Sequence, residues 1–567
     1  MNHAVIPIVE QNAVRQRKRE APKGRRVEPN ALADVQALLG NASRQRDLLI
    51  EHLHLIQDKF GHLSAAHLAA LAQEMRLAQT EVYEVASFYH HFDIVKEGQT
   101  APPKLTVRVC DGLSCEMAGA QGLLERLPAL LGREVRVIAA PCIGRCEQAP
   151  AVAVGQVPLA NAKVEDVVTA VAKVQTGTPA ESAVAEVSHA DYVASGGYAV
   201  LKACLAGTHS VDSVIATLEH SGLRGLGGAG FPAGRKWKIV RAEAGPRLMA
   251  VNIDEGEPGT FKDRVLLERD PHRFIEGMLI AAWAVGIEDL YVYLRDEYHG
   301  GRAILTQALA DLRANPPIAP LPRIHLRRGA GAYICGEESA MIESIEGKRG
   351  MPRLRPPYVA QVGLFGRPTL EHNFETLYWV RELLEKGGDW FAAQGRHGRK
   401  GLRSFSVSGR VVSPGMKLAP AGITVQELID EHCGGMLPGH RLYGYLPGGA
   451  SGGILPASLN AVPLDFDTLQ PYGSFIGSAA VVVLSDQDTA KMAARNTIRF
   501  FQHESCGQCT PCRNGTAKAG ALIAKDQWDI DLLAELSEVM RDASICGLGQ
   551  AAPNPVDSVI KYFPQEL

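Results

Sequence analysis

Residues 505–515 read S-C-G-Q-C-T-P-C-R-N-G, and residues 544–549 read S-I-C-G-L-G. The cysteines of these two stretches are Cys506, Cys509, Cys512 and Cys546. Three thiolates at C-x2-C-x2-C spacing, with a fourth from elsewhere in the fold, suit a [4Fe–4S] cluster. The alternative is a structural zinc site, but zinc sites usually combine two separate C-x2-C pairs. The pattern therefore predicts a [4Fe–4S] cluster near the end of the chain.

A second group of four cysteines follows two predicted strands. L-T-V-R-V-C-D (Leu105–Asp111) and V-R-V-I-A-A-P-C (Val135–Cys142) are rich in β-branched residues, as strands are. The candidate ligands at their ends are Cys110, Cys115, Cys142 and Cys146. Two cysteine pairs held by neighbouring strand ends can bind a [2Fe–2S] cluster, one iron per pair. Zinc is again the alternative, although this spacing is poor for a zinc finger.

The bulk composition sets limits on the class of protein. The chain has 567 residues, enough for three or four domains, with 46% apolar and 21% charged residues and a net charge of −3. This charge does not indicate nucleic-acid binding, and no apolar run reaches the ~20 residues of a membrane-spanning helix. Eleven cysteines without a secretory signal favour a reducing, cytoplasmic compartment. Cys204, Cys335 and Cys433 lie outside both groups and are expected to be buried free thiols.

Alternating helical and strand patterns predict a multidomain α/β protein. The composition of its N-terminus predicts disorder, because Lys and Arg dominate there. The predicted segments are a disordered basic arm (1–30), a helical segment (31–100), a small α/β [2Fe–2S] domain (101–176), a linker (177–199), a nucleotide-binding α/β domain (200–400), a compact α+β module (401–487) and a helical [4Fe–4S] domain (488–567).

A glycine-rich loop, G-L-G-G-A-G at residues 225–230, matches G-x-G-x-x-G. The context differs from a Rossmann fingerprint, because a helix rather than a strand precedes the loop. Its glycines still allow backbone N–H groups to approach a phosphate or a planar ring closely. Phe231, Lys236 and Trp237 follow and add aromatic faces and a cation.

Acidic residues follow the predicted strand Leu248–Val251. Carboxylates beyond a strand's carboxyl end suit hydrogen bonds to a ribose or an isoalloxazine ring, and a solvated acidic loop is the alternative. The candidates are Asn252, Asp254, Glu255 and Glu257. A second glycine loop, residues 329–338, opens a helix whose N-terminus favours anions.

Two cysteine quartets beside a nucleotide-type fold, without a Ser/His/Asp arrangement, predict electron transfer rather than hydrolysis. A hydride donor supplies two electrons together, whereas iron–sulfur clusters accept them singly. A flavin can do both, so we expect a flavin between a nicotinamide nucleotide and the clusters.

Four long motifs carry a resemblance to a known family: G-L-R-G-L-G-G-A-G-F-P-A-G-R-K-W, D-E-G-E-P-G-T-F-K-D-R, R-G-A-G-A-Y-I-C-G-E-E and E-S-C-G-Q-C-T-P-C-R-N-G. They resemble the flavin- and NADH-binding subunit of respiratory complex I. The part before residue 176 resembles the thioredoxin-like [2Fe–2S] subunit of complex I, so the chain is similar to a fusion of the two. L-P-G-G-A-S-G-G-I-L-P-A-S and D-A-S-I-C-G-L-G-Q-A-A resemble the beta subunit of NAD-dependent molybdenum or tungsten formate dehydrogenases.

The resemblance implies cofactors, domains and partners. It implies a Rossmann-like FMN/NAD domain, a ubiquitin-like module at 401–487, and hydride transfer between NAD(H) and FMN without a catalytic side chain. It implies a partner subunit holding a molybdenum or tungsten pterin and further iron–sulfur clusters, with no nucleic acid and no membrane. The implied FMN-binding residues are Gly225, Gly227, Gly228, Gly230, Lys236, Asn252, Asp254, Gly336, Glu337, Asn373 and Thr376. The implied NAD(H)-binding residues are Phe231, Glu257, Tyr333, Glu338, Arg355 and Tyr358.

Departures from the complex I pattern occur at four positions. Leu226 stands where Arg is usual, Arg355 where Lys is usual, Tyr358 where Phe is usual and His372 where Asn is usual. The last puts one polar contact to the flavin in doubt. Three alternatives stay open: the diaphorase subunit of an NAD-reducing hydrogenase, complex I itself, and a non-enzymatic electron-relay scaffold.

Overall fold

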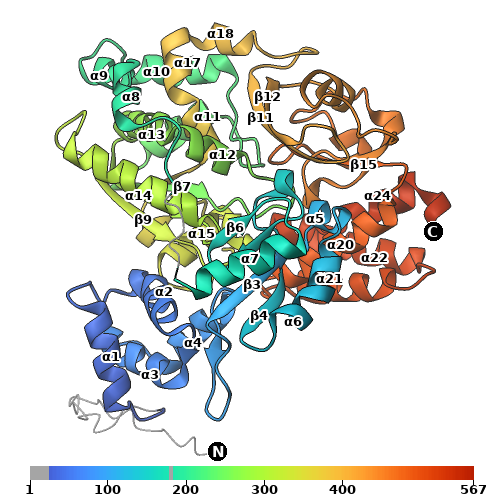
Figure 1. Cartoon of the computed structure of the whole chain (residues 1–567). Coiled ribbons are helices and arrows are strands. Elements are labelled where there is room, and N and C mark those ends of the chain that lie inside the picture. Colours follow the sequence, from blue (N-terminus) through green and yellow to red (C-terminus); the bar gives the residue numbers. More distant parts are fainter. Residues whose placement is uncertain (1–23, 178–182) are drawn as a thin grey trace, which may run out of the picture.

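The computed structural model describes residues 24–177 and 183–567 (Figure 1). Residues 1–23, most of the predicted basic arm, lie outside the described part. The first helix, α1, begins at Pro29. The described chain forms a multidomain α/β protein, as predicted. None of its helices is long and apolar enough to cross a membrane.

Four helices make up the N-terminal segment: α1 (Pro29–Leu39), α2 (Leu49–Phe60), α3 (Ala65–Met75) and α4 (Gln79–Phe88). A two-stranded parallel sheet of β1 (Leu63–Ser64) and β2 (Ile94–Val95) was not predicted, because two-residue strands have no readable alternation. The segment is attached to the second glycine loop. The His91 N–H donates to the Ala330 carbonyl at 3.2 Å, and His54 Nε2 lies 2.8 Å from the Gly329 carbonyl oxygen.

The next domain is a four-stranded sheet with thioredoxin-like character, in the order β4-β3-β5-β6. The central strand β3 pairs in parallel with β4 and antiparallel with β5. The short strand β6 was not predicted. The elements of this domain are β3 (Leu105–Cys110), α5 (Leu113–Met117), α6 (Ala120–Leu131), β4 (Val135–Ala140), β5 (Val152–Val154), β6 (Val157–Leu159) and α7 (Val164–Gln175).

The second half of the predicted linker 177–199 contains a helix. Residues 178–182 lie outside the described part, but helix α8 (His189–Ala194) packs on the next domain. The Tyr192 hydroxyl donates to the Glu276 carboxylate, and the Tyr198 N–H donates to Glu276 Oε2 at 2.8 Å. The Thr, Ala, Ser and Gly content of the segment predicted a linker, although two of its residues, Tyr192 and Tyr198, are buried. Helix α9 (Ala199–Leu205) continues the same layer.

The central domain is built on an all-parallel sheet in the order β10-β7-β8-β9. Its strands are β7 (Arg247–Ile253), β8 (Ile287–Leu294), β9 (Arg323–Arg328) and β10 (Thr369–Asn373), of which β10 was not predicted. The helices around them are α10 (Val211–Ser221), α11 (Ala233–Ala242), α12 (Lys262–Arg269), α13 (Pro271–Val285), α14 (His299–Ala314), α15 (Glu338–Ile345), α16 (Phe374–Tyr378), α17 (Val380–Lys386) and α18 (Gly388–Ala392). Because the strands are parallel, the loops after all four emerge at one edge, where such sheets bind ligands.

A second, mixed sheet follows, in the order β12-β11-β15-β13-β14. Its β12–β11, β15–β13 and β13–β14 pairs are antiparallel, and the β11–β15 pair is parallel, which is the strand arrangement of ubiquitin-like folds. Its strands are β11 (Leu402–Gly409), β12 (Gly415–Pro420), β13 (Leu442–Leu446), β14 (Leu455–Pro456) and β15 (Ala480–Ser485). The predicted helix at Thr424–Glu431 is a short α-helix, α19 (Val425–Glu427), followed by a π-helical turn, Leu428–His432.

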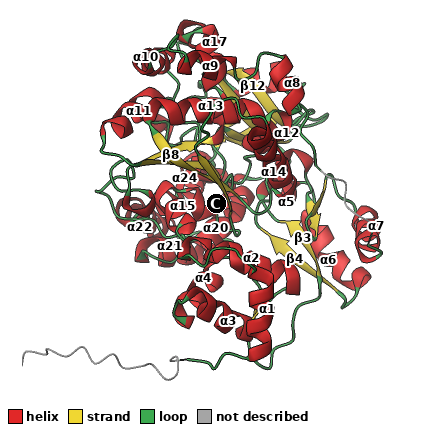
Figure 2. Ribbon diagram, turned by 90° about the vertical axis from the view of Figure 1, so that its left-hand side faces the viewer, coloured by secondary structure: helices red, strands yellow, loops and turns green. Residues whose placement is uncertain are grey.

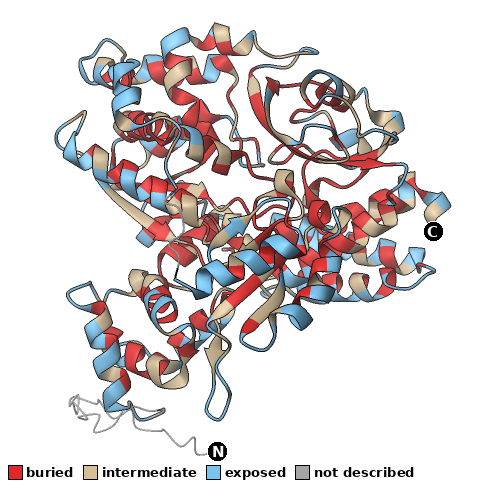
Figure 3. Ribbon diagram, viewed as in Figure 1, coloured by how far each residue is buried: buried red, intermediate tan, exposed pale blue. Residues whose placement is uncertain are grey.

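The C-terminal region consists of helices, which lie beneath the central sheet beside the N-terminal ones (Figure 2). They are α20 (Ala490–Glu504), α21 (Thr510–Ile523), α22 (Ile530–Ala543), α23 (Gly547–Ala551) and α24 (Asn554–Tyr562). One apolar core joins the N-terminal helices, the second glycine loop and these C-terminal helices. Figure 3 shows buried residues, in red, in both the N-terminal and the C-terminal helices. The loop is thus held from two sides.

Candidate functional site

A cavity of about 340 Å³ lies at the C-terminal edge of the central sheet. Three parts of the chain form its wall. The central domain contributes the loops after β7, β9 and β10, the ubiquitin-like module contributes Ser451, Phe475 and Ser478, and the C-terminal helices contribute Leu548 and Ala551. The cavity therefore exists only when the three parts are packed together.

Ten of the predicted cofactor-binding residues line this cavity. They are Gly227, Gly228, Asn252, Asp254, Glu255, Glu257, Tyr333, Gly336, Glu337 and Asn373. Residues far apart in the sequence, on both glycine loops and the acidic loop, thus share one site. Their convergence follows from the parallel sheet, whose carboxyl ends meet at this edge.

Side-chain amides fix the loops around the cavity. Asn252 Nδ2 donates to the Gly336 carbonyl at 2.9 Å, and Asn252 Oδ1 accepts from the Asp254 N–H at 3.0 Å. A Cβ at Gly336 would lie 3.1 Å from the Asp254 carbonyl oxygen, and one at Gly227 would lie 3.0 Å from the Asn373 Cβ. Both positions are tight for any added side chain, and as glycines they leave backbone to form this part of the wall.

Asp254 provides a test of whether the wall fits a polyhydroxylated cofactor. Its Oδ2 atom is buried and has no hydrogen-bond partner among the described residues. Burial raises the pKa of this carboxyl well above its usual value. A buried acceptor without a partner in a cavity wall is the group that a ligand hydroxyl satisfies. The wall therefore fits the ribityl chain of a flavin.

Glu257 connects the central domain with the ubiquitin-like module. Its carboxylate accepts from the Ser451 N–H at 2.7 Å and from the Tyr333 hydroxyl. Burial raises the pKa of Glu257 and of Glu255, that of Glu255 to about 7. The cavity is thus lined by carboxyls whose charge the protein disfavours.

Lys262 and Asp263 are buried charged residues that line the cavity, and the sequence analysis did not assign them to the site. Lys262 Nζ lies 2.7 Å from Asp263 Oδ1 and 3.1 Å from Glu375 Oε2, and Asn373 Nδ2 donates to Asp263 Oδ2 at 2.6 Å. Nearby carboxylates raise the pKa of Lys262 despite burial, which acts in the opposite direction. The signal in the sequence was an adjacent Lys-Asp pair inside the quoted motif T-F-K-D-R.

The other predicted FMN-binding residues, Gly225, Gly230, Lys236 and Thr376, lie outside the cavity wall. Thr376 Oγ1 accepts from the Leu226 N–H at 2.9 Å, and Lys236 Nζ donates to the Glu371 carbonyl at 3.1 Å. Gly225 and Gly230 belong to the loop but do not line the cavity. A Cβ at Gly230 would lie 2.5 Å from the Phe466 ring.

The predicted NAD(H)-binding residues outside the wall are largely accessible. Phe231 is 38% exposed and Tyr358 is 56% exposed. Arg355 pairs with Glu337, which lines the cavity, and lies 3.0 Å from Glu338.

His372, whose departure from the family pattern raised doubt about a flavin contact, does not line the cavity. It is buried, and its Nε2 accepts from Trp237 Nε1 at 2.7 Å. Burial lowers the pKa of His372 well below its usual value. The imidazole is therefore a neutral acceptor inside the domain.

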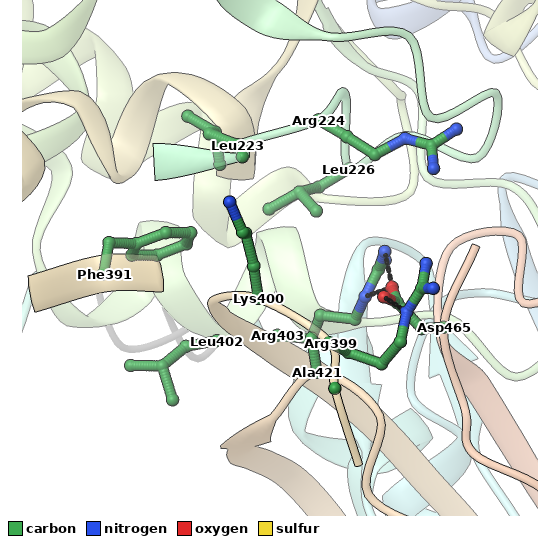
Figure 4. A pocket seen from close by; sticks show the side chains of 12 residues that line it. Leu223, Arg224, Leu226, Phe391, Arg399, Lys400, Leu402, Arg403, Ala421 and Asp465 are labelled. Carbon is green, nitrogen blue, oxygen red and sulfur yellow. Dashed lines mark hydrogen bonds and ion pairs between the residues drawn. The ribbon is translucent and has the colours of Figure 1, made fainter. Parts of the chain in front are cut away.

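A second cavity, of about 280 Å³, separates the central domain from the ubiquitin-like module (Figure 4). On one side of it, Arg399 and Arg403 donate to Asp465, at 2.7 and 2.6 Å. Leu223 and Leu226 form its apolar wall. The predicted site residues, all of which the structure describes, do not line this cavity.

The cysteines of the C-terminal motif surround one small cavity. Ile334 and Leu548 line this cavity and also line the larger one, so the two share a wall. Burial raises the pKa of Cys512 to about 11 and that of Cys546 to about 12. Thiols held in this way become thiolates when a cation binds, as iron–sulfur ligands do. The four cysteines brought together are Cys506, Cys509, Cys512 and Cys546.

The cysteines of the thioredoxin-like domain are also gathered. Cys142 Sγ and Cys146 Sγ are 3.3 Å apart, and the Ala151 N–H donates to Cys115 Sγ at 3.4 Å. Hydrogen bonds from Cys110 and Cys146 lower the pKa of Cys142, and the Arg295 charge acts in the same direction. All four thiols are nearly inaccessible to solvent, so the donor set fits a buried [2Fe–2S] cluster. Cys204, Cys335 and Cys433 are buried and free, as expected.

Comparison with known families covers most of the chain. Residues 35–175 match the thioredoxin-like [2Fe–2S] ferredoxin family, and residues 218–382 match the Nuo51 FMN-binding domain. Residues 492–567 match the iron–sulfur binding region of the NADH-ubiquinone oxidoreductase-F family. The chain thus contains an FMN-binding domain, a [2Fe–2S] domain and a [4Fe–4S] region.

Individual members of such families are similar to this chain in sequence and structure. The chain is 43% identical over 390 residues to an NADH-quinone oxidoreductase subunit of Rhizobium meliloti, covering 66% of this chain and 92% of that protein. It is 41% identical over 375 residues to the mitochondrial NADH dehydrogenase [ubiquinone] flavoprotein 1 of Dictyostelium discoideum, covering 63% and 78%. A chain of the NAD⁺-reducing [NiFe]-hydrogenase crystal structure in the H₂-reduced state superposes with a TM-score of 0.80 and 33% identity, covering 92% of both chains.

Proposed function

This chain belongs to the family of complex I 51 kDa-type, FMN- and NADH-binding subunits, and from that membership we propose how its site works. It is an NAD(H):FMN oxidoreductase, a diaphorase subunit with iron–sulfur clusters. One observation carries the proposal: the cavity with flavin-type walls shares Ile334 and Leu548 with the pocket of the C-terminal cysteines. A flavin in the first cavity would lie directly beside a [4Fe–4S] cluster in the second.

In the proposed mechanism the protein holds and orients two stacked rings. FMN, when bound, accepts two electrons together as a hydride and releases them singly. Backbone groups of Gly227, Gly228 and Gly336 and the side chains of Asn252 and Asp254 would hold the flavin. Glu257 and Tyr333 lie at the junction with the ubiquitin-like module and would face the nucleotide. The site needs no side chain as a general acid or base, because bound NAD(H) and FMN would themselves supply the hydride chemistry.

The nucleotide would enter over the accessible side of the flavin. Phe231 and Tyr358 offer exposed rings there, and Arg355 offers a cation beside Glu338. A guanidinium suits the pyrophosphate of NAD(H), because it binds phosphate oxygens bidentately. The residues that we assign to the NAD(H) site are Phe231, Glu257, Tyr333, Glu338, Arg355 and Tyr358.

The finer proposal concerns the partner. We propose that electrons arrive from formate, which a molybdenum or tungsten pterin subunit oxidises, and that the chain passes them to NAD⁺. Its support is the motif L-P-G-G-A-S-G-G-I-L-P-A-S and the ending D-A-S-I-C-G-L-G-Q-A-A. A hydrogenase partner has equal support, because a crystal structure of an NAD⁺-reducing [NiFe]-hydrogenase contains a similar chain. We also propose a cytoplasmic location, since the eleven cysteines, all of them in the described part of the chain, form no disulfide, which suits a reducing compartment.

Two measurements test these proposals. Anaerobically purified protein should release FMN on heating and should reduce a dye with NADH. A preparation that contains iron but neither flavin nor NADH-driven dye reduction would favour the relay scaffold. Metal analysis of the co-purified complex then distinguishes the partners, because molybdenum or tungsten supports formate oxidation and nickel contradicts it.

A further inference from the structure

Two arginines of the flavin domain reach the loop that holds two [2Fe–2S] cysteines. Arg295, directly after β8, donates from Nη2 to the Cys142 carbonyl at 2.7 Å. Arg264 donates from Nε to the Gly144 carbonyl at 3.0 Å. Their side chains are 5% and 2% exposed. The cluster loop is therefore bound to the flavin domain by two buried guanidinium groups.

Arg295 also touches the wall of the flavin cavity. Its Nη1 donates to the backbone carbonyl of Glu255, which lines that cavity. The Tyr298 hydroxyl donates to Glu255 Oε2 at 2.7 Å, and a Cβ at Gly144 would lie 2.3 Å from the same hydroxyl oxygen. One guanidinium thus bridges the wall of the flavin cavity and the backbone of a cluster ligand.

The two guanidinium groups differ in how far their charge is neutralised. Arg264 faces two carboxylates, Glu147 and Glu268, the latter at 2.8 Å. Arg295 has one partner, Glu297, whose Oε2 lies 3.1 Å from its Nε and whose side chain is 24% exposed. Arginine keeps its charge at every accessible pH. Arg295 therefore places the less compensated positive charge beside Cys142.

We propose that Arg295 sets the reduction potential of the [2Fe–2S] cluster while it positions the cluster loop against the flavin cavity. The proposal rests on the proposed function, because it requires FMN and the [2Fe–2S] cluster in their assigned sites. One electron from the reduced flavin converts the oxidised cluster to the reduced cluster and adds one negative charge. A buried cation beside a ligand favours that added charge and so raises the potential.

The test is an EPR-monitored redox titration of the full-length protein in its complex. Arg295→Gln should shift the cluster's reduction equilibrium at least tenfold towards the oxidised form, about 59 mV lower for one electron. Arg295→Lys keeps the charge and should stay within about threefold of wild type. Glu297→Gln removes the compensating carboxylate and should shift the equilibrium in the opposite direction.

Arg323→Gln is the matched control. Arg323 begins β9 at the opposite end of the same sheet, where it pairs with Asp289 and its side chain is 72% exposed. This variant should leave the cluster potential unchanged.

Equal shifts of the cluster potential in Arg295→Gln and Arg295→Lys would overturn the proposal. A purely structural role of Arg295 would not depend on whether the substituted side chain keeps the charge. If Arg295→Gln fails to fold, the sign of the Glu297→Gln shift decides instead. A wild-type protein without flavin or a [2Fe–2S] signal would refute the proposed function. A wild type with both, and variants whose potentials do not move, would refute only the role of Arg295.

Discussion

Gly230 shows how closely single residues constrain the flavin loop. Its φ is +66°, a left-handed conformation, and a Cβ there would lie 2.5 Å from the Phe466 ring. Arg224, at the start of the same loop, donates to the Gly230 carbonyl and places its guanidinium 4.5 Å from the centre of the Phe466 ring. The loop is thus pressed against the ubiquitin-like module by contacts that allow no side chain at this position.

We expect Gly230→Ala to lower both stability and flavin content. Left-handed backbone costs alanine about 1–2 kcal/mol, and displacement of the Phe466 ring adds to this. Gly473→Ala is the control, because its φ is +74° but no atom lies within 4 Å of the added Cβ. Urea unfolding and FMN release measure the two effects. Equal losses in both variants would show that Phe466 does not restrain the loop.

His372 predicts a pH dependence of stability. An exposed histidine has a pKa near 6.5, whereas burial lowers the pKa of His372 well below that. As the pH falls below about 6.5, the unfolded chain takes up a proton that the folded chain does not. The contribution of His372 to the free energy of unfolding is therefore complete above about pH 6.5, and it decreases by up to about 1.4 kcal/mol per pH unit below it.

The variant for this test is His372→Asn, which cannot titrate and carries the residue usual in complex I. Between pH 7.5 and pH 5.5, wild type should lose more unfolding free energy than the variant, as measured by urea denaturation. The other buried histidines contribute equally to both proteins. Parallel losses would contradict the prediction.

At the scale of elements, helix α13 positions the flavin site through its contact with α16. Gly277 lies at their closest approach, since a Cβ there would lie 1.9 Å from the Leu377 carbonyl oxygen. Helix α16 begins directly after Asn373, which lines the flavin cavity and accepts the Glu375 N–H at 3.0 Å. The spacing of these two helices therefore determines where β10 presents Asn373.

Gly277→Ala should separate α13 from α16 and destabilise the protein by more than about 3 kcal/mol, because the added methyl group meets backbone rather than a movable side chain. Gly122→Ala, in the exposed helix α6 where no neighbour lies within 4 Å, should instead gain up to about 1 kcal/mol. Thermal unfolding of both variants measures the contrast. A mild effect at Gly277 would mean that the helices can move apart without cost.

At the scale of the whole molecule, the redox sites lie where three parts of the chain meet. The flavin cavity is closed by the ubiquitin-like module and by the C-terminal helices. The Cys142–Cys146 loop is held by Arg264 and Arg295 of the central domain. Domain packing thus brings both cysteine groups close to the cavity proposed for the flavin.

Removing one cluster should therefore separate the activities of the molecule. Cys546→Ser should abolish the [4Fe–4S] EPR signal and lower electron transfer to the partner subunit by more than about tenfold, while NADH-driven dye reduction at the flavin persists. Cys433→Ala, a buried thiol outside both groups, should retain both clusters. Loss of dye reduction in Cys546→Ser would show that the cluster is also needed to build the flavin cavity.

Much of the fold followed from local patterns, and its exceptions have physical reasons. β10 was missed because T-L-E-H-N has polar residues that become buried only beside β7. The second half of the linker was missed because Tyr192 and Tyr198 find their partner, Glu276, far away in the sequence. Lys262 was not assigned because its buried carboxylate partners include Glu375, on another helix.

The type of chemistry can be read from local sequence: two cysteine quartets, two glycine loops and an acidic loop, because ligand type and spacing are properties of neighbouring residues. How these centres are connected depends on the three-dimensional packing. Ile334 and Leu548 are shared by two cavities, and Arg295 reaches Cys142, through contacts between distant segments. Such contacts depend on how whole domains pack, and local periodicity carries no information about that.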